Sequence, residues 1–304
     1  MGVLALFVGI FIGILRCLRY IKKMKDQTLM PQDWRTHPIV AIDTETSGQY
    51  PMQDDLCELA AVKSLNGQVI DTFQVLVKPK ETMSDFVIGI HGITNEMVAQ
   101  APPIEDVLAD FMSFIGDGVI VGHHSPFDLG FLVYDLEKLG MRLPDQPAFC
   151  SSLLARKAIL GPPNHKLQTL VKYLSLDGGQ AHRALDDAHA CLQLFFECVR
   201  RKGLNTFEEI FKLQGQPLWW QDFSLKGKAL VNQTWQKVIK AIETQKNLEI
   251  IYQGGSNKGK KREVQPLSIV CSPTGDFLVA LDPKEPGPSK RFYLKKLSEA
   301  EIIP

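Results

Sequence analysis

The apolar run at residues 39–42 ends abruptly in Asp43-Thr44-Glu45, and this junction most constrains what the chain can fold into. The run predicts a buried strand. Because side chains alternate along a strand, Asp43 and Glu45 would point the same way, a few ångströms apart. Two carboxylates at the edge of an apolar core repel each other and lose hydration. The pair therefore needs a function that offsets its cost.

The composition leaves room for such a site. The chain has 304 residues, enough for one sizeable domain and a smaller one. Residues 1–25 carry five basic side chains and no acidic one, residues 225–304 carry 14 basic and 8 acidic ones, and the stretch between them is acidic. This pattern suits a metal site flanked by surfaces that attract phosphate or lipid. The six cysteines have no metal-like spacing, which favours reduced thiols and a cytosolic compartment.

The first 25 residues predict a membrane anchor. Residues 1–15 contain no charged side chain, and residues 2–21 as a helix would span about 30 Å, the thickness of the hydrocarbon core. All flanking positive charge follows this segment. We therefore expect a single-pass transmembrane helix, with the rest of the protein facing the cytoplasm. The alternative is a short apolar helix that packs on the protein or lies in the membrane interface.

The remaining chain predicts two domains. Strand patterns at 38–43, 58–63, 69–77 and 118–123 alternate with helical patterns at 104–115, 127–139, 150–160, 166–175 and 184–201. Asn66-Gly67 predicts a tight hairpin turn. These patterns indicate an α/β domain over 36–203. A linker over 204–232 then leads to a module over 233–304, with a helix near 234–246 and several short strands.

Three further residues can join Asp43 and Glu45. Asp128 follows a predicted strand and lies in the first turn of a helix, where helix capping would also explain it. His182 precedes the helix at 184–201 and can approach Asp187 only from the preceding loop. Four carboxylates can hold two divalent cations that stabilise the attacking and leaving oxygens of a phosphodiester. A histidine can take a proton from the attacking water near neutral pH.

The order of these residues resembles the DEDDh 3′→5′ exonucleases, the superfamily of the proofreading subunit of bacterial DNA polymerase III and of RNase T. The three motifs are "DTETSG" (43–48), "HHSPFDLGFL" (123–132) and "HRALDDA" (182–188). The resemblance implies an RNase H-like fold, a mixed sheet flanked by helices. It also implies that Asp43, Glu45, Asp128 and Asp187, rather than Asp186, hold two Mg²⁺ or Mn²⁺ ions, with His182 as the general base.

The same resemblance extends to substrate contacts. The segments "IHGITNEMV" (90–98) and "NHKLQTL" (164–170) are similar to family segments, the first of which lies beside the terminal nucleotide in relatives. The implied substrate-binding residues are Thr44, Thr46, His91, Gly92, Ile93 and Phe127. His124 departs from the asparagine that is usual in the family, which leaves the ligands intact. Glu58 is most simply the polar start of a strand, and the alternative is a supporting position beside the metal ligands. The resemblance also suggests a homodimer.

The C-terminal module combines basic and aromatic residues, as nucleic-acid-binding surfaces do. The equally simple alternative is solvated lysines on a small barrel whose aromatic residues form its core. The segment resembles the WYL domain, an SH3/Sm-like β-barrel, with Asp276-Phe277-Leu278 in place of the eponymous tripeptide. The residues expected to contact nucleic acid are Tyr252, Lys260, Lys261, Arg262 and Arg291.

These patterns predict a membrane-anchored, metal-dependent 3′→5′ exonuclease that releases nucleoside monophosphates from single-stranded 3′ ends, with DNA favoured over RNA. One alternative is a catalytically idle nucleotide or nucleic-acid sensor at the membrane. Another keeps the chemistry but acts on short oligonucleotides. The choice of sugar depends on contacts with the 2′-OH, which the sequence does not show.

Overall fold

The computed structural model describes residues 32–215, 217–255, 257–284 and 287–303. The anchor predicted for residues 1–25 lies outside these residues. Within the described ranges, no helix is both long enough and apolar enough to cross a bilayer. The longest described helix, α8 (Ala184–Lys202), carries charged residues in its first and last turns, whereas a crossing needs about 20 predominantly apolar residues. The predicted localisation, a single-pass membrane anchor with domains facing the cytoplasm, is therefore corrected.

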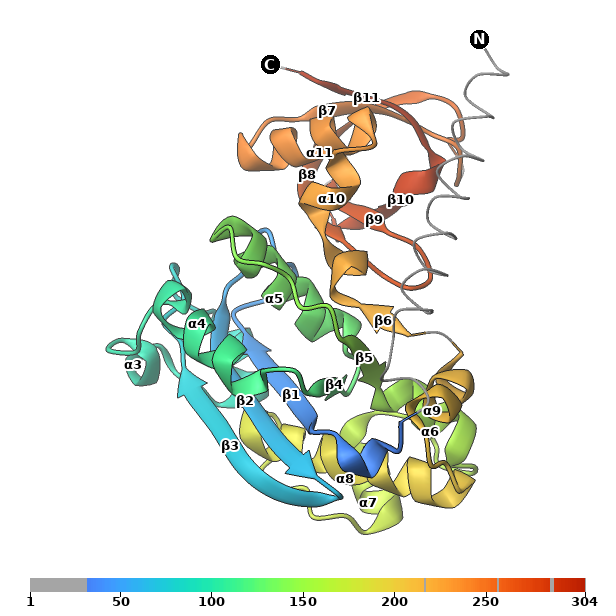
Figure 1. The fold of residues 1–304 in the computed structure, drawn as a ribbon. Coiled ribbons are helices and arrows are strands. Elements are labelled where there is room, and N and C mark those ends of the chain that lie inside the picture. Colours follow the sequence, from blue (N-terminus) through green and yellow to red (C-terminus); the bar gives the residue numbers. More distant parts are fainter. Residues whose placement is uncertain (1–31, 216, 256, 285–286, 304) are drawn as a thin grey trace.

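A six-stranded mixed sheet forms the first part of the molecule, which confirms the predicted α/β class (Figure 1). Its strands are β1 (Ile39–Thr46), β2 (Leu56–Leu65), β3 (Gln68–Leu76), β4 (Val119–Gly122), β5 (Pro147–Cys150) and β6 (Leu218–Trp219), in the order β3-β2-β1-β4-β5-β6. β1 pairs antiparallel with β2 and parallel with β4. Asn66 and Gly67 both have positive φ, as the tight turn between β2 and β3 requires.

Helices cover both faces of this sheet, which explains why β1 opens with an uninterrupted apolar run. Val40 and Ile42 join the cluster formed with α4 (Ile104–Ile115) and α5 (Pro126–Lys138). Ile39 and Ala41 join the opposite cluster, formed with α6 (Ser151–Ala158), α7 (Leu167–Leu174), α8 and α9 (Phe207–Gln214). The short helices α2 (Asp85–His91) and α3 (Asn95–Val98) lie between β3 and α4 in the chain.

A second, antiparallel sheet contains the C-terminal strands, as the short alternating runs predicted. Its strands are β7 (Leu248–Tyr252), β8 (Lys261–Val270), β9 (Phe277–Leu281), β10 (Lys290–Tyr293) and β11 (Leu297–Ile302), in the order β10-β9-β8-β7-β11. The predicted helix near 234–246 is α11 (Gln233–Glu243), which packs against β8 and β11. We refer to residues 248–302 as the C-terminal sheet.

The segment between the two sheets is ordered structure rather than an open connection. It contains α9, β6, the 3-10 helix η2 (Trp220–Phe223) and α10 (Leu225–Ala229). The fully buried Trp220 belongs to an apolar cluster that runs from α4 and α5 into the C-terminal sheet. The Glu137 carboxylate of α5 accepts hydrogen bonds from the backbone N–H groups of Leu225 (3.1 Å) and Lys226 (3.2 Å) at the start of α10. The two sheets are therefore joined through a continuous core.

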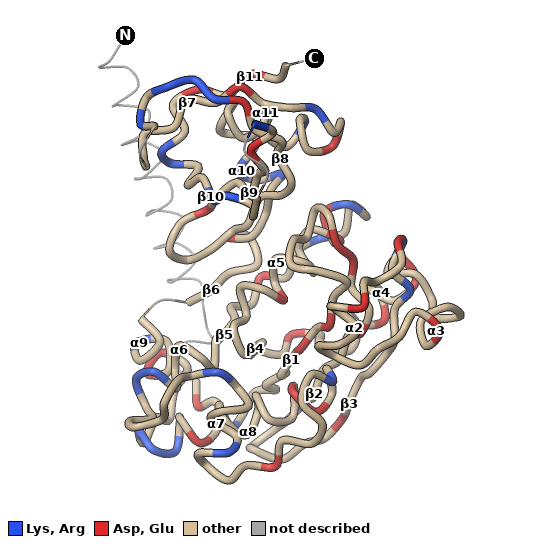
Figure 2. The backbone as a smooth tube through the Cα atoms, turned by 180° about the vertical axis from the view of Figure 1, so that it is seen from behind, with Lys and Arg blue, Asp and Glu red and all other residues tan. Residues whose placement is uncertain are grey.

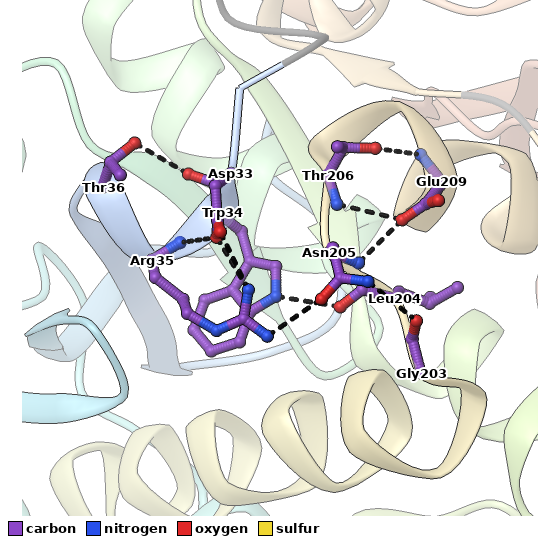
Figure 3. A network of polar contacts seen from close by, with 9 residues as sticks. All are labelled: Asp33, Trp34, Arg35, Thr36, Gly203, Leu204, Asn205, Thr206 and Glu209. Atoms are coloured by element: carbon purple, nitrogen blue, oxygen red, sulfur yellow. Dashed lines mark hydrogen bonds and ion pairs between the residues drawn. The ribbon is translucent and has the colours of Figure 1, made fainter.

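The start of the described chain is fixed to the turn between α8 and α9 (Figure 3). Asp33 forms a β-bridge with Thr206, and the Trp34 indole donates to the Leu204 carbonyl oxygen at 3.1 Å. The Thr206 side chain and Glu209 complete a capping box at the start of α9. These contacts join residues about 170 positions apart and close the first domain where the chain enters it.

Candidate active site at the end of β1

Four carboxylates meet at the end of β1 because three elements converge there. β1 supplies Asp43 and Glu45. The adjacent parallel strand β4 ends at Gly122, and α5 follows with Asp128 in its first turn. α8 packs across β1 and β2 and carries Asp187 in its first turn. These are the residues that the sequence singled out.

The acidic side chains are largely removed from water. Glu45 is 9%, Asp128 3% and Asp187 7% exposed. The Thr44 hydroxyl donates to Asp128 Oδ1 at 2.9 Å, and the Gln168 amide donates to Asp187 Oδ1 at 2.7 Å. These two bonds fix the orientation of two of the carboxylates.

Gly122 lets the Asp128 carboxylate approach the end of strand β4. A Cβ at Gly122 would lie 3.3 Å from Asp128 Oδ2 and 3.1 Å from Ser125 Oγ. The Gly122 N–H donates to Ser125 Oγ at 3.2 Å. A side chain at this position would crowd the turn that places Asp128, so the sequence supplies a residue without one.

The electrostatics of the site follow from burial and mutual repulsion. Burial, followed by the charges of Asp128 and Glu45, raises the pKa of Asp43 well above its ordinary value. Burial, followed by repulsion from Asp187, raises the pKa of Glu45 to about 8. Burial raises the pKa of Asp128 to about 7 and also raises that of Asp187. The cluster is therefore costly to ionise unless cations approach it.

His182 completes the cluster from the loop that precedes α8. One ring nitrogen of His182 and one carboxylate oxygen each of Glu45 and Asp187 all lie within 4.8 Å of one another. His182 is exposed, whereas Glu45 and Asp187 are held against the sheet. Its position two residues before α8 removes the helical offset that would have kept it away from Asp187.

This donor set is suited to divalent cations. Carboxylate oxygens are the ligands that Mg²⁺ prefers, and imidazole with carboxylates also suits Mn²⁺. Repulsion from the neighbouring acidic groups adds to burial in raising the pKa values of Asp43 and Glu45. Asp43, Glu45, Asp128 and Asp187 are thus the residues that would hold such ions, with His182 at their exposed side.

Asp186 and Asp187 are neighbours with separate roles. Asp186 Oδ2 accepts the backbone N–H of Gln180 at 2.8 Å, within the loop before α8. Asp187 Oδ2 accepts the backbone N–H of His182 at 3.2 Å. The structure thus directs Asp187 into the cluster and Asp186 towards the loop.

The predicted substrate-binding residues lie around the cluster, several of them buried. His91 is 3% exposed; its Nδ1 accepts the Ile93 N–H at 3.0 Å, and its Nε2 lies 3.7 Å from Cys57 Sγ. Gly92 ends α2 in the left-handed conformation, and Ile93 is fully buried. These contacts fold the segment after α2 against the sheet. Contact with a nucleotide stays a prediction for this segment.

The other predicted substrate-binding residues have identifiable partners within the protein. Thr44 holds Asp128, and the Thr46 hydroxyl donates to the Gly48 carbonyl oxygen at 2.5 Å. The Phe127 ring lies 5.1 Å from that of Phe131. Phe127 is half-buried and precedes Asp128 in the first turn of α5.

The C-terminal candidates divide by exposure. Tyr252 is 8% exposed and packs edge-on against Phe292 at 5.2 Å, which places its ring in the core of the C-terminal sheet. Lys261 pairs with Glu249, and the Arg262 guanidinium donates to the Asn257 carbonyl oxygen at 2.7 Å. The exposed members of the set are Lys260, Lys261 and Arg291. Lys and Arg residues gather on the C-terminal sheet and around α6 and α7 (Figure 2).

Two further polar residues lie beside the cluster: Glu58, for which the sequence raised such a position only as an alternative, and Gln168, for which it raised none. Glu58 is fully buried on β2, directly opposite Glu45, and Gln168 binds Asp187. The signal for Glu58 was a charged residue in an otherwise apolar run, "LCELAAV". Gln168 lies within the "NHKLQTL" segment already noted for its resemblance to the family.

Comparison with known proteins identifies the class to which this fold and site belong. Residues 40–195, just over half of the chain, match the model of the exonuclease family RNase_T. The chain belongs to this family. The match ends before the C-terminal sheet. The resemblance of that sheet to WYL domains therefore stays a prediction.

Individual relatives agree with this assignment. The chain is 36% identical over 162 residues to the PolC-type DNA polymerase III of Oceanobacillus iheyensis, which covers 53% of this chain and 11% of that protein. It is 34% identical over 181 residues to the PolC-type enzyme of Bacillus subtilis, covering 58% and 13%. The chain thus spans little more than a tenth of the length of these relatives.

A solved structure shares the fold over a longer stretch. E. coli exonuclease I in complex with a dA16 oligonucleotide superposes with a TM-score of 0.51 and 17% identity, covering 81% of this chain and 55% of that one. At this identity the likeness concerns the fold alone.

Proposed function

We propose that this protein is a metal-dependent 3′→5′ exonuclease that hydrolyses terminal phosphodiesters of nucleic acid, DNA in preference to RNA, and releases nucleoside monophosphates. The observation that carries the proposal is the convergence of His182 with Glu45 and Asp187 at an edge that also holds Asp43 and Asp128. The choice of DNA is supported by the relatives, which are DNA polymerases, and by the oligonucleotide bound to E. coli exonuclease I.

Each residue has a role that its environment supports. The four carboxylates would hold two Mg²⁺ or Mn²⁺ ions, whose charge stabilises the attacking and leaving oxygens of a phosphodiester. Thr44 and Gln168 orient the carboxylates of Asp128 and Asp187. His182 is exposed at the edge of the cluster, where its imidazole can accept a proton from the attacking water.

The test uses the full chain with 5′-labelled single-stranded DNA and RNA oligonucleotides in Mg²⁺, in Mn²⁺ and in EDTA. We expect a metal-dependent ladder that shortens from the 3′ end, faster on DNA, with no ladder in EDTA. His182→Ala should slow cleavage by about 10²-fold or more. Uncut substrate under every metal, with binding retained, would contradict the proposal and favour a nucleic-acid sensor. Cleavage restricted to short oligonucleotides would narrow the substrate class.

We also propose that residues 36–203 carry the chemistry, that 204–232 connect the two parts, and that 233–304 form a binding module. Exposed Arg291 stacks over Phe277 at 5.0 Å, beside the half-exposed Tyr293. The Tyr50 hydroxyl, in the turn that follows β1, lies 3.3 Å from Ser289 Oγ, immediately before β10. The strand that carries Arg291 thus begins beside the loop that follows the acidic strand.

The expected consequence is a contribution to substrate affinity. Arg291→Ala should raise KM for oligonucleotides and reduce the salt dependence of binding, with kcat unchanged, because the residue would contact phosphate rather than the reacting atoms. An unchanged KM and salt slope would remove Arg291 from the proposal. The homodimer raised by the family resemblance has no support in the comparisons, and the proposed reaction uses the residues of one chain.

A further inference from the structure

The backbone at His182 is held in an uncommon conformation. Its φ is 59°, in the left-handed region that residues other than glycine rarely adopt. Such a conformation persists where the surrounding structure enforces it. The His182 N–H donates to Asp187 Oδ2, but this bond alone fixes only one end of the peptide. The restraint on the next two residues, Arg183 and Ala184, comes from strand β2.

Glu58 supplies that restraint. It is fully buried on β2, and its carboxylate accepts four hydrogen bonds. Arg183 donates from Nε at 3.2 Å and from Nη2 at 2.8 Å, and the Ala184 backbone N–H donates at 2.9 Å. The fourth donor is the Gln74 amide of β3, at 2.8 Å. Three of the four bonds therefore hold the two residues that follow His182.

This contact also begins α8. Arg183 occupies the N-cap position but makes no capping hydrogen bond with its side chain. Glu58 instead accepts the N–H of Ala184, the first residue of the helix, from a strand 126 positions earlier in the chain. A carboxylate at a helix N-terminus is favoured by the helix dipole and satisfies an otherwise unpaired donor. The helix thus begins where Glu58 places it.

We call the contacts of Glu58 with Arg183 and Ala184 the clamp, and the position of Glu58 places this clamp next to the candidate active site. Glu58 lies directly opposite Glu45 in the register of β1 and β2. The negative charge of Glu58 contributes to raising the pKa of Glu45, which is a cost that an apolar side chain would avoid. Glu58, which holds the loop of His182, is therefore the direct cross-strand neighbour of Glu45 in the acidic cluster.

We infer that Glu58 is a positioning residue that, through Arg183 and the first turn of α8, holds His182 over the acidic cluster. The inference rests on the proposed function for its kinetic consequence. It concerns a residue that does not itself touch the substrate and that acts through the loop carrying His182.

A double-mutant cycle tests this link. Glu58→Gln keeps the size of the side chain but removes the charge that holds Arg183. We expect kcat for oligonucleotide cleavage in Mg²⁺ to fall by about 10²-fold, as for a displaced catalytic group, with KM changed by less than about twofold. In a His182→Ala background the same substitution should change kcat by less than about twofold, because the group that it positions is gone. Equal losses in both backgrounds, or an unchanged kcat, would overturn the inference.

Arg183→Met tests the same contact from its more exposed end, because the Arg183 side chain is 25% exposed. It should reproduce the loss of kcat even if Glu58→Gln fails to fold. Arg200→Met is the matched control: Arg200 also pairs with a glutamate, Glu197, but in the last turn of α8. Its kcat should equal that of the wild type. A loss as large as that of Arg183→Met would show a general effect on α8.

Amide hydrogen exchange gives a readout that does not depend on cleavage. Glu58→Gln and Arg183→Met should speed exchange at His182 and Ala184 while leaving the amides of β1 protected. If no metal supports cleavage by the wild type, the proposed function fails and this measurement alone decides the clamp. Unchanged exchange at both amides would then overturn it.

Discussion

Two glutamates face each other across β1 and β2, and their environments are opposite. Burial and neighbouring acidic groups raise the pKa of Glu45 to about 8. Burial also acts to raise the pKa of Glu58, but hydrogen bonds from Arg183, Ala184 and Gln74 outweigh it and lower that pKa. The carboxylate on β1 is therefore repelled by its neighbours, whereas the carboxylate on β2 has its hydrogen bonds and its charge satisfied.

The difference shows which of the two carboxylates remains available to a ligand. The charge of Glu58 is already compensated by Arg183, whereas Glu45 faces Asp187, Asp128 and Glu58 itself. An uncompensated cluster is expensive in the free protein and is relieved by a bound cation. Structural and candidate catalytic roles are thus distinguished by partners rather than by residue type.

The largest expected effect is on catalysis at the unsatisfied member of the pair. Glu45→Gln should reduce the cleavage rate by about 10³-fold, as the loss of a group that supports transition-state charge does. The free protein should nevertheless melt at a higher temperature at pH 8, because one repelling charge is removed. Cleavage assays and thermal melts in EDTA measure the two effects. Cleavage within tenfold of the wild type would contradict the role of Glu45.

The satisfied member of the pair should show the opposite pattern of stability. Glu58→Leu leaves Arg183 without its partner beside a buried helix start, and should lower the free energy of unfolding by about 3 kcal/mol. Urea denaturation measures the change. Glu197→Leu, which breaks a pair nearer the surface of α8, serves as the comparison and should cost less than about 1 kcal/mol. Equal losses would mean that burial of Glu58 adds nothing to the clamp.

The pH dependence of stability should divide in the same way. The raised pKa values of Glu45, about 8, and Asp128, about 7, mean that the folded protein keeps protons that the unfolded chain releases. Their effect is therefore to lower stability as pH rises from about 4.5 to 8 in the absence of metal. The pKa of Glu58 is lowered in the folded protein, so this group stabilises the fold at pH values above its ordinary pKa. That stabilisation is lost as the pH falls through the lowered pKa.

Thermal melts in EDTA between pH 5 and 8.5 test this prediction. We expect the melting temperature to fall with increasing pH above about 5, and added Mg²⁺ to raise it more at pH 8 than at pH 5.5. A melting temperature that rises steadily to pH 8 without metal would show that the cluster does not control stability in this range.

The smallest effect should come from the neighbour that points away from the cluster. Asp186→Asn retains an acceptor for the Gln180 N–H, so cleavage should stay within about threefold of the wild type. Asp187→Asn, one residue further along the chain, should abolish cleavage. Oligonucleotide assays on the pair separate the two aspartates. A severe loss in Asp186→Asn would place that residue in the cluster.

Local patterns predicted much of the fold and the candidate residues. The apolar run at 39–42, the Asn66-Gly67 turn and the periodicity of 184–201 gave β1, the β2–β3 hairpin and α8, because each depends on neighbours in the sequence. The connecting segment was missed as structure because β6 and Trp220 are ordered by contacts with distant residues. The burial of Tyr252 has the same origin, since its aromatic partner, Phe292, lies 40 residues later.

By itself, the sequence determined that Asp43 and Glu45 share one face of a strand, because alternation is a property of any strand. It also determined that His182 had to lie on a loop to approach Asp187. Only the tertiary structure decided that Glu58 stands opposite Glu45 and holds the start of α8, because strand register and helix docking depend on how separate elements pack, and the contact between Glu58 and Ala184 joins residues 126 positions apart. Which carboxylate is satisfied and which is left in conflict is a property of those long-range contacts.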